Sequence, residues 1–158
     1  MERSQKQDLL SSTLTDLKKA EVFITYVPLR TEIPFRDFVA IPDDKMVYEV
    51  PPRAALDPFE EAQSARSTAG GAQACILLPG RSFDRYGTRQ GQGGGWYDRF
   101  LSAVPKEWVR VGFCFEKQFS EERLLRAPWD EPMDYLVVVG EKGVRSIRTN
   151  ARAGTLAA

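Results

Sequence analysis

A cluster of glycines between two apolar runs is the feature that most constrains how this chain can fold. Its members lie within five positions, and they are Gly91, Gly93, Gly94 and Gly95. A strand-like apolar run at residues 75–78 precedes the cluster, and a helix-like run at residues 96–104 follows it. This order brings backbone N–H groups and the start of a helix toward a phosphate group. The pattern therefore predicts a phosphate-binding loop; the alternative is a surface turn that uses glycine for its positive φ angles.

Two better-known nucleotide-binding patterns do not fit this loop. A Walker loop requires Gly-Lys-Ser or Gly-Lys-Thr, and the chain contains neither. A dinucleotide fingerprint that starts at Gly91 needs a glycine where Trp96 stands. The charged neighbours still favour phosphate binding, because the guanidinium of Arg89 can grip a phosphate and Asp98 can ligate a metal ion. The structural alternatives are an ion pair of Arg89 with Asp84 or Asp98, and a helix-dipole role for Asp98.

The composition narrows the chemistry that is open to the chain. The 158 residues favour one domain, and 22 acidic residues balance 22 basic ones, so no net field attracts nucleic acid or an anionic membrane. The chain contains no histidine, which excludes Ser-His-Asp and Cys-His catalysis and histidine metal sites. It has no long apolar span or signal pattern, and Cys75 and Cys114 lie in apolar runs, where reduced thiols are expected. We therefore expect a cytoplasmic protein.

Apolar periodicity predicts an alternation of strands and helices. The expected strands are residues 21–27, 46–50, 75–78, 110–115, 135–139 and 144–147. The expected helices are residues 2–19, 34–39, 57–65 and 96–104, and residues 67–73 are expected to form a flexible loop. The alternation predicts a three-layer α/β/α fold with a mostly parallel, Rossmann-like sheet. A single domain at residues 1–148 and a disordered tail at 149–158 are expected.

The stretch from Pro79 to Arg99 resembles the core motif of the 5-formyltetrahydrofolate cyclo-ligase family, whose members are also called methenyltetrahydrofolate synthetases. The matching positions are Pro79, Gly80, Phe83, Asp84, Gly87, Arg89, Gly91, Gly93, Gly95, Tyr97, Asp98 and Arg99. Two later segments are similar to the family as well, namely residues 111–119 and the Pro-Met-Asp sequence at 132–134. The resemblance covers roughly residues 20–147 and is strongest from Pro79 onward.

The resemblance implies an ATP-dependent ring closure. In this family ATP phosphorylates the formyl oxygen of 5-formyltetrahydrofolate, and the N10 amine then displaces phosphate to give 5,10-methenyltetrahydrofolate. ADP and phosphate are the other products. Phosphoryl transfer depends on positioning and charge neutralisation, which agrees with a chain that lacks histidine. The implied partners are folate, ATP and Mg²⁺, without nucleic acid or membrane, and we expect a monomer.

The resemblance also implies roles for individual residues. Arg89 would be catalytic, and Asp98 and Asp134 would bind Mg²⁺. The ATP-binding residues would be Arg89, Gly91, Gln92, Gly93, Gly94, Gly95, Trp96 and Tyr97, and the folate-binding residues would be Glu32, Gly93, Gly94, Gly95 and Trp96. Trp96 and Tyr97 could stack on a flat pterin or adenine ring, or Trp96 and Phe100 could pack the helix onto the sheet. Asp134 and Glu32 could instead be solvated surface acids.

Three features depart from the family pattern. The basic helix with which family members usually begin is expected to be missing, and the segment between Val50 and Cys75 is short. Gln90 stands at a position that is usually aliphatic, and Gln92 at one that is often basic or aromatic. These departures predict reduced activity. A non-catalytic paralogue that binds nucleotide or folate is therefore the alternative function, and a shortened gene product that folds poorly is a third.

Overall fold

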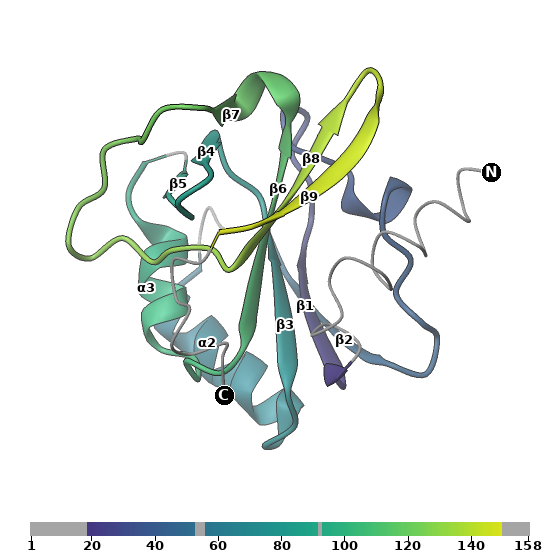
Figure 1. Cartoon of the computed structure of the whole chain (residues 1–158). Helices are drawn as coiled ribbons and strands as arrows, with labels where there is room; N and C mark the ends of the chain where they lie inside the picture. Colours follow the sequence, from purple (N-terminus) through teal and green to yellow (C-terminus); the bar gives the residue numbers. More distant parts are fainter. Residues whose placement is uncertain (1–18, 53–55, 92, 150–158) are drawn as a thin grey trace.

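The computed structural model of the protein describes residues 19–52, 56–91 and 93–149. Its centre is a six-stranded sheet in the order β2-β1-β3-β6-β8-β9 (Figure 1). The strands are β1 (Val22–Tyr26), β2 (Met46–Val50), β3 (Ala74–Leu78), β6 (Val109–Phe115), β8 (Tyr135–Gly140) and β9 (Gly143–Arg148). Neighbouring strands run parallel, except that β8 and β9 form an antiparallel hairpin. The mostly parallel α/β sheet is therefore confirmed.

The central strands are buried on both faces, as strands of parallel sheets usually are. Every residue of β1 and β3 is buried, and their sequences, VFITY and ACILL, are nearly continuous apolar runs. β9 forms the edge of the sheet, and its side chains are mainly exposed. Cys75 and Cys114 lie within the sheet as free, buried thiols, and burial raises the pKa of both.

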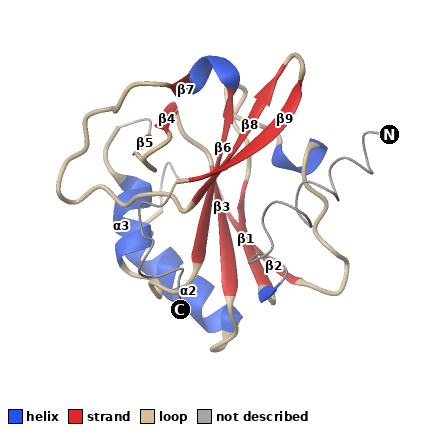
Figure 2. Ribbon diagram, in the orientation of Figure 1, coloured by secondary structure: helices blue, strands red, loops and turns tan. Residues whose placement is uncertain are grey.

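Two helices cover one face of the sheet (Figure 2). α2 (Pro58–Ala69) begins at Asp57, whose carboxylate accepts a hydrogen bond from the Phe59 N–H at 2.8 Å. It ends at Gly70, which has a φ of 58°. α3 (Trp96–Ser102) packs beside α2. Within the described part of the chain, no helix is both long and apolar enough to cross a lipid bilayer.

The opposite face is covered by the segment that joins β1 to β2. Ile33, Phe35 and Val39 of this segment are buried against the sheet. The Tyr26 hydroxyl at the end of β1 donates a hydrogen bond to the Ile33 carbonyl oxygen at 2.6 Å. The helix expected at residues 34–39 is only the 3-10 turn η3 (Phe35–Asp37). Apart from Lys19, the helix expected at residues 2–19 lies outside the described residues.

Two segment boundaries differ from the sequence prediction. Residues 67–69 belong to α2 and not to a flexible loop, because the helix continues until Ala69 is buried in the core. Thr149, expected in a disordered tail, is buried instead. Its hydroxyl donates to the Met133 carbonyl oxygen at 2.6 Å, and its N–H donates to the Asp134 carbonyl oxygen at 3.0 Å. Residues 150–158 lie outside the described part of the chain.

A second, small sheet beyond the carboxyl end of β3 is not predicted by the sequence. Its order is β5-β4-β7, with β4 at Ser82–Asp84, β5 at Arg89–Gln90 and β7 at Phe119–Ser120. These strands are too short to show a periodic pattern. The turn between β4 and β5 is held by the buried Asp84, whose Oδ1 accepts hydrogen bonds from the N–H groups of Tyr86 and Thr88, both at 2.9 Å. The small sheet therefore folds part of the glycine-rich motif into ordered structure.

Candidate functional site

The structure has a cavity of about 250 Å³ at the carboxyl edge of the central sheet. It lies beyond the carboxyl end of β3, and ligands of open α/β sheets commonly bind beyond such strand ends. The lining residues come from the glycine loop, the start of α3 and the connection between β7 and β8: Arg89, Gln90, Gly91, Gly93, Gly95, Trp96, Tyr97, Asp98, Leu125, Trp129 and Asp130. Most of the residues expected at a phosphate site therefore surround one cavity.

The glycine loop adopts a backbone conformation that residues with a side chain rarely reach. Gly93, Gly94 and Gly95 have φ angles of 101°, 78° and 67°. Arg99 of α3 supports the loop, because its Nη1 donates a hydrogen bond to the Gly94 carbonyl oxygen at 2.6 Å. Gln92, which was expected to bind ATP, lies outside the described residues. The glycines are thus required by the turn itself, and they keep the loop free of bulk beside the cavity.

Arg89 lies in β5 and is buried, with only 7% of its surface exposed. Its Nε donates a hydrogen bond to the Pro79 carbonyl oxygen at 2.6 Å, and its guanidinium carbon lies 4.9 Å from the centroid of the Tyr97 ring. A Cβ atom at Gly91 would lie 3.2 Å from both Nη atoms, so a glycine there leaves room for the guanidinium. Arg89 is therefore a buried strand residue beside the glycine loop, so its truncation is expected to affect stability as well as binding.

Two carboxylates meet at the cavity beside Arg89. Asp98, in the first turn of α3, accepts a hydrogen bond from the Glu131 N–H at 3.0 Å. Burial raises the pKa of Asp98, and the Glu131 hydrogen bond and the positive charge of Arg89 oppose that rise. The negative charge of Asp130 and a side-chain hydrogen bond with it raise the pKa further. The pair concentrates negative charge at one point, which suits a divalent cation.

Asp98→Asn is expected to raise the melting temperature at neutral pH. The pKa of Asp98 is higher in the folded protein than its usual 3.8, so the ionised carboxylate destabilises the native state once the pH exceeds the raised pKa. Asparagine keeps an acceptor for the Glu131 N–H without the charge. The difference from wild type should therefore disappear as the pH falls below 3.8, where both side chains are neutral. Thermal melts across pH without divalent cations measure this, and a difference that does not change with pH would contradict it.

Asp134 lies outside the cavity and has no exposed surface. Its Oδ2 accepts a hydrogen bond from the Arg110 N–H at 2.9 Å, and its own N–H donates to the Arg110 carbonyl oxygen at 2.9 Å. These bonds join the start of β6 to the residue that precedes β8. The structure does not bring Asp134 together with Asp98; Asp130 lies beside Asp98 instead. Asp130 and Asp134 both precede β8 in the sequence, and nothing in the surrounding residues indicates which of them lies beside Asp98.

Glu32 is buried beyond the carboxyl end of β1 and does not line the cavity. Its Oε1 accepts a hydrogen bond from the Leu29 N–H at 2.9 Å. Burial raises the pKa of Tyr26, and the nearby negative charge of Glu32 raises it further. Because β1 and β3 are parallel, the segments that follow their carboxyl ends, which carry Glu32 and the glycine loop, lie at the same edge of the sheet.

The two aromatic residues expected to stack on a ligand are engaged in packing. The Trp96 ring stacks on Phe100, with centroids 5.6 Å apart and an angle of 14° between the ring planes. The Trp96 Nε1 donates a hydrogen bond to the Leu56 carbonyl oxygen at 3.0 Å. Tyr97 is buried under Arg89 and meets Phe100 edge to face. The packing interpretation of Trp96 and Phe100 is confirmed.

One wall of the cavity comes from the connection between β7 and β8, residues 121–134, which we name the β7–β8 loop. It contributes Leu125, Trp129 and Asp130, and sequence reasoning missed all three. The loop swings outward past α3 before it returns to the central sheet (Figure 1). It has no regular secondary structure, so no periodic pattern could have identified it. The only signal in the sequence is Asp130, an acidic residue shortly before the buried strand β8.

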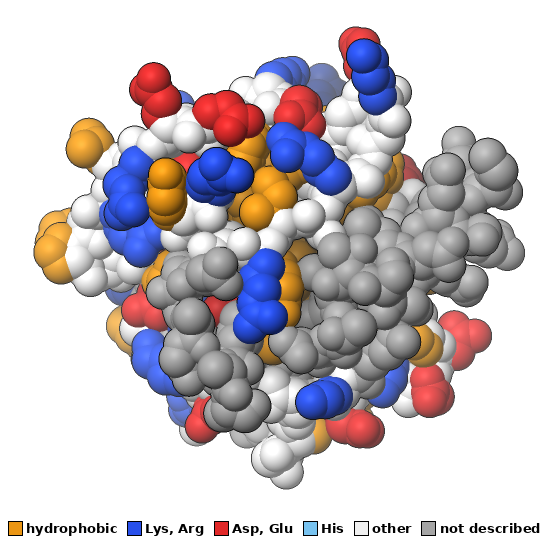
Figure 3. Space-filling view, in the orientation of Figure 1, with side chains coloured by type: hydrophobic (Ala, Val, Ile, Leu, Met, Phe, Trp, Pro, Cys, Tyr) orange, Lys and Arg blue, Asp and Glu red, His pale blue; other side chains and the backbone are white. Residues whose placement is uncertain are grey.

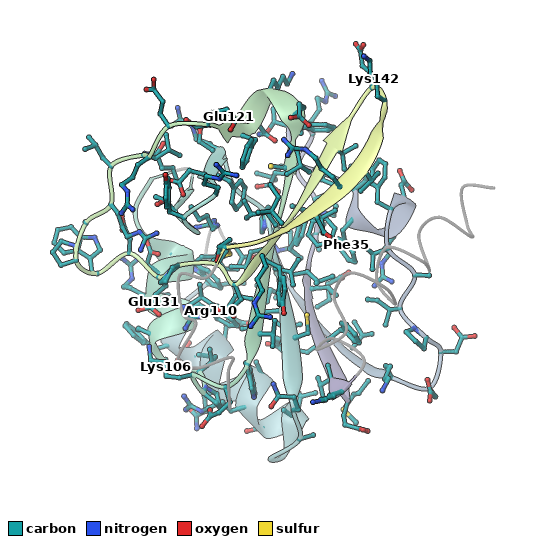
Figure 4. All side chains as sticks on the ribbon, in the orientation of Figure 1. Phe35, Lys106, Arg110, Glu121, Glu131 and Lys142 are labelled. Atoms are coloured by element: carbon teal, nitrogen blue, oxygen red, sulfur yellow. The ribbon has the colours of Figure 1, made fainter. Side chains whose placement is uncertain are left out.

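Ion pairs fix the returning end of the β7–β8 loop. Glu131 lies 2.8 Å from the Nη1 of Arg110, which is fully buried, and 3.3 Å from the Nζ of Lys106. Figure 4 shows the three side chains close together beside α3. Because Glu131 also donates its N–H to Asp98, these contacts hold the loop against the carboxylate end of the cavity.

Comparison with known proteins gives the chain a family. A family model described as the 5-formyltetrahydrofolate cyclo-ligase family matches residues 2–139. The chain belongs to the 5-formyltetrahydrofolate cyclo-ligase family. The resemblance of residues 79–99 is thereby confirmed, and the chain is a member of a family of enzymes.

Individual relatives of the cyclo-ligase family are similar to the chain to different extents. A 5-formyltetrahydrofolate cyclo-ligase from Mycoplasma genitalium is 32% identical over 66 residues, which are 42% of this chain and 39% of that protein. One from Mycoplasma pneumoniae is 26% identical over 135 residues, which are 81% of this chain and 79% of that protein. The solved structure of a 5,10-methenyltetrahydrofolate synthetase from Mycoplasma pneumoniae shares the fold, with a TM-score of 0.52 and 19% identity over 87% of this chain and 83% of that one.

Proposed function

We propose that this cyclo-ligase family member converts 5-formyltetrahydrofolate to 5,10-methenyltetrahydrofolate in a reaction that consumes ATP and requires Mg²⁺. The observation that carries the proposal is the cavity at the carboxyl edge of the sheet, where Arg89, the glycine loop and the pair Asp98 and Asp130 line one space. The names of the Mycoplasma relatives support the folate substrate. A cytoplasmic location is part of the proposal, because two buried, unpaired thiols suit a reducing compartment.

The glycine loop and Arg89 would hold the phosphate chain of ATP. Glycines with positive φ let a backbone approach phosphate oxygens without interference from side chains. The guanidinium of Arg89 is already oriented by the Pro79 carbonyl oxygen and the Tyr97 ring. A donor that is oriented before the reaction stabilises developing charge without the cost of being ordered during it. Arg89 is therefore the residue that we assign to the transferring phosphoryl group.

Asp98 and Asp130 fit a magnesium ion better than Asp98 and Asp134 do. Mg²⁺ usually takes one or two carboxylates and fills its other positions with phosphate oxygens and water. Asp98 and Asp130 are in contact at the cavity, whereas Asp134 is fully buried away from it. Among the residues that the structure describes, no larger group of acidic or cysteine side chains gathers at one point. When bound there, Mg²⁺ would neutralise charge on the triphosphate.

The proposed chemistry has two steps. The formyl oxygen of the folate attacks the γ-phosphorus of ATP, and ADP leaves. The N10 amine then attacks the activated formyl carbon and loses its proton, and phosphate departs with the former formyl oxygen. Neither step needs a side-chain nucleophile, so a site built from an arginine, two carboxylates and backbone amides is sufficient.

Asp130→Asn is expected to raise the Mg²⁺ concentration needed for half-maximal rate by at least about tenfold, because a metal site loses one of its charged ligands. The rate is followed by the absorbance of methenyltetrahydrofolate formed from 5-formyltetrahydrofolate and ATP. Asp44→Asn is the matched control, because Asp44 is an exposed acid outside the cavity. An unchanged Mg²⁺ dependence in Asp130→Asn would remove this residue from the metal site. Binding of ATP or folate by the wild type without any turnover would favour the non-catalytic alternative.

A further inference from the structure

The β7–β8 loop presents two large apolar side chains to water at the cavity. Leu125 is 89% exposed and Trp129 is 71% exposed, and both line the cavity. Figure 3 shows apolar side chains projecting from the edge of the molecule over which this loop runs. Large exposed apolar groups beside a concave, polar site commonly mark a surface that a ligand covers. Trp129 is thus an aromatic group at the cavity whose ring faces are not buried by the protein.

The other aromatic residues at the cavity cannot offer a ring face so readily. One face of Trp96 is covered by Phe100, and its indole N–H is bonded to the Leu56 carbonyl oxygen. Tyr97 is buried, with Arg89 over its ring. A flat ligand would have to displace the guanidinium to stack on Tyr97, and Trp96 is already held by its contacts with Phe100, Tyr97 and Leu56. Trp129 requires no such rearrangement.

A tight turn holds Trp129 in place. The Asp130 N–H donates to the Ala127 carbonyl oxygen at 3.0 Å, and the Ala127 N–H donates to the Asp130 carboxylate at 2.8 Å. Pro128 takes the second position of this turn, where its fixed φ is favourable, and Trp129 takes the third. The turn therefore places the indole at its apex, directly before the carboxylate that meets Asp98.

The β7–β8 loop is anchored on both sides of this turn. Before it, the Leu124 N–H donates to the Asp84 carboxylate at 2.8 Å, and the Nη2 of Arg126 donates to the Thr88 hydroxyl at 3.0 Å. After it, the Glu131 N–H donates to Asp98 at 3.0 Å. An aromatic ring on an anchored turn loses less conformational entropy on binding than one on a free loop.

We propose that Trp129 is a binding residue on which the flat heteroaromatic ring of one of the two substrates stacks. This inference rests on the function proposed above. The adenine of ATP and the pterin of 5-formyltetrahydrofolate share the required chemistry, a planar ring with a π face. Because Asp130 follows Trp129 directly, the stacked ring would lie close to the charged end of the cavity, with Leu125 giving further apolar contact.

The test is a calorimetric titration of wild type, Trp129→Ala and Trp129→Phe with three probes: Mg-ATP, Mg-tripolyphosphate and 5-formyltetrahydrofolate. Trp129→Ala is expected to weaken the binding of at least one ring-bearing probe by about five- to a hundredfold, while tripolyphosphate, which has no ring, binds as in wild type. Trp129→Phe should recover most of the loss, because it keeps a π face. The probe that is affected identifies the substrate. Phe59→Ala is the control, since Phe59 is 50% exposed on α2 but does not line the cavity.

Two results would overturn the inference alone. One is wild-type affinity of Trp129→Ala for both ring-bearing probes. The other is an equal loss of tripolyphosphate binding, which would mean that Trp129 acts by positioning Asp130. Failure of the proposed function would give a different result. If the wild-type protein binds a probe but forms no methenyltetrahydrofolate, the proposed activity is wrong and the stacking role of Trp129 still stands. Wild type that binds none of the probes would overturn both.

Discussion

Arg89→Ala is expected to lower kcat by about a hundredfold to a thousandfold, with a smaller effect on ATP affinity. The guanidinium is oriented by the Pro79 carbonyl oxygen and the Tyr97 ring, and it lies at the cavity with Asp98. Its charge would act on the phosphoryl group as that group moves, and the loss of one such preoriented donor costs about this factor in rate. Single-turnover rates and ATP titrations separate the two effects.

The same substitution is expected to reduce the free energy of unfolding by about 2–4 kcal/mol. Arg89 is buried, and its truncation removes a charge-assisted hydrogen bond and a cation–π contact. Arg89→Lys should keep the charge and recover only part of both losses, because lysine lacks the planar fork. Rates are therefore compared well below the melting temperature of each variant. Arg85→Ala is the control, since Arg85 is exposed on the adjacent turn.

If Arg89→Ala is fully folded under the assay conditions and keeps the wild-type kcat, Arg89 has only a structural role. A fall in ATP affinity as large as the fall in kcat would assign Arg89 to ground-state binding of the nucleotide and not to the phosphoryl transfer.

Gly112→Ala is expected to lower stability by about 2–3 kcal/mol, or roughly 5–10 °C in melting temperature. Gly112 lies in β6 under the ring of Phe83, a fully buried residue of β4. A Cβ atom there would lie 2.4 Å from the Cε1 of Phe83 and 3.1 Å from the Cδ2 of Leu136. Neither neighbour has free space beside it, because the core around them is closely packed, so any shift that relieves the clash disturbs the packing. The ring of Phe83 must shift, and β4 with it.

Activity should fall together with stability in Gly112→Ala. β4 pairs with β5, which carries Arg89, so a displaced Phe83 ring would move the arginine that we assign to phosphoryl transfer. Gly140→Ala is the matched control: Gly140 is also a strand glycine, but its nearest neighbour would be the partly exposed Glu116 carboxylate at 3.3 Å, which can turn away. Thermal melts and steady-state rates test both variants. Equal melting temperatures for the two would mean that the small sheet tolerates movement of Phe83.

Much of the main sheet could be predicted from the sequence, because each central strand is a short apolar run with turn residues at its ends. VFITY and ACILL are clear examples, and both became buried parallel strands. The start of α3 could also be predicted, since three glycines directly precede an aromatic and apolar run. The small sheet could not, because two- and three-residue strands carry no period; its position depends on Asp84, which binds the backbone of both its own turn and the β7–β8 loop.

The sequence by itself determined the order along the chain of the strands in the central sheet, the place of the glycine loop between a strand and a helix, and the set of chemical groups available in a chain without histidine. These are local properties: side-chain period, tolerance of positive φ and composition can all be read along the chain. Only the tertiary structure decided that Asp130 and not Asp134 lies beside Asp98, that Arg89 is buried, and that Trp129 lines the cavity. The physical reason is that contacts between residues 21 to 40 positions apart place the β7–β8 loop. Chief among them are the hydrogen bonds to Asp84 and Asp98 and the ion pair of Glu131 with Arg110. Such contacts depend on how separate segments meet in space, and they leave no periodic trace in the sequence.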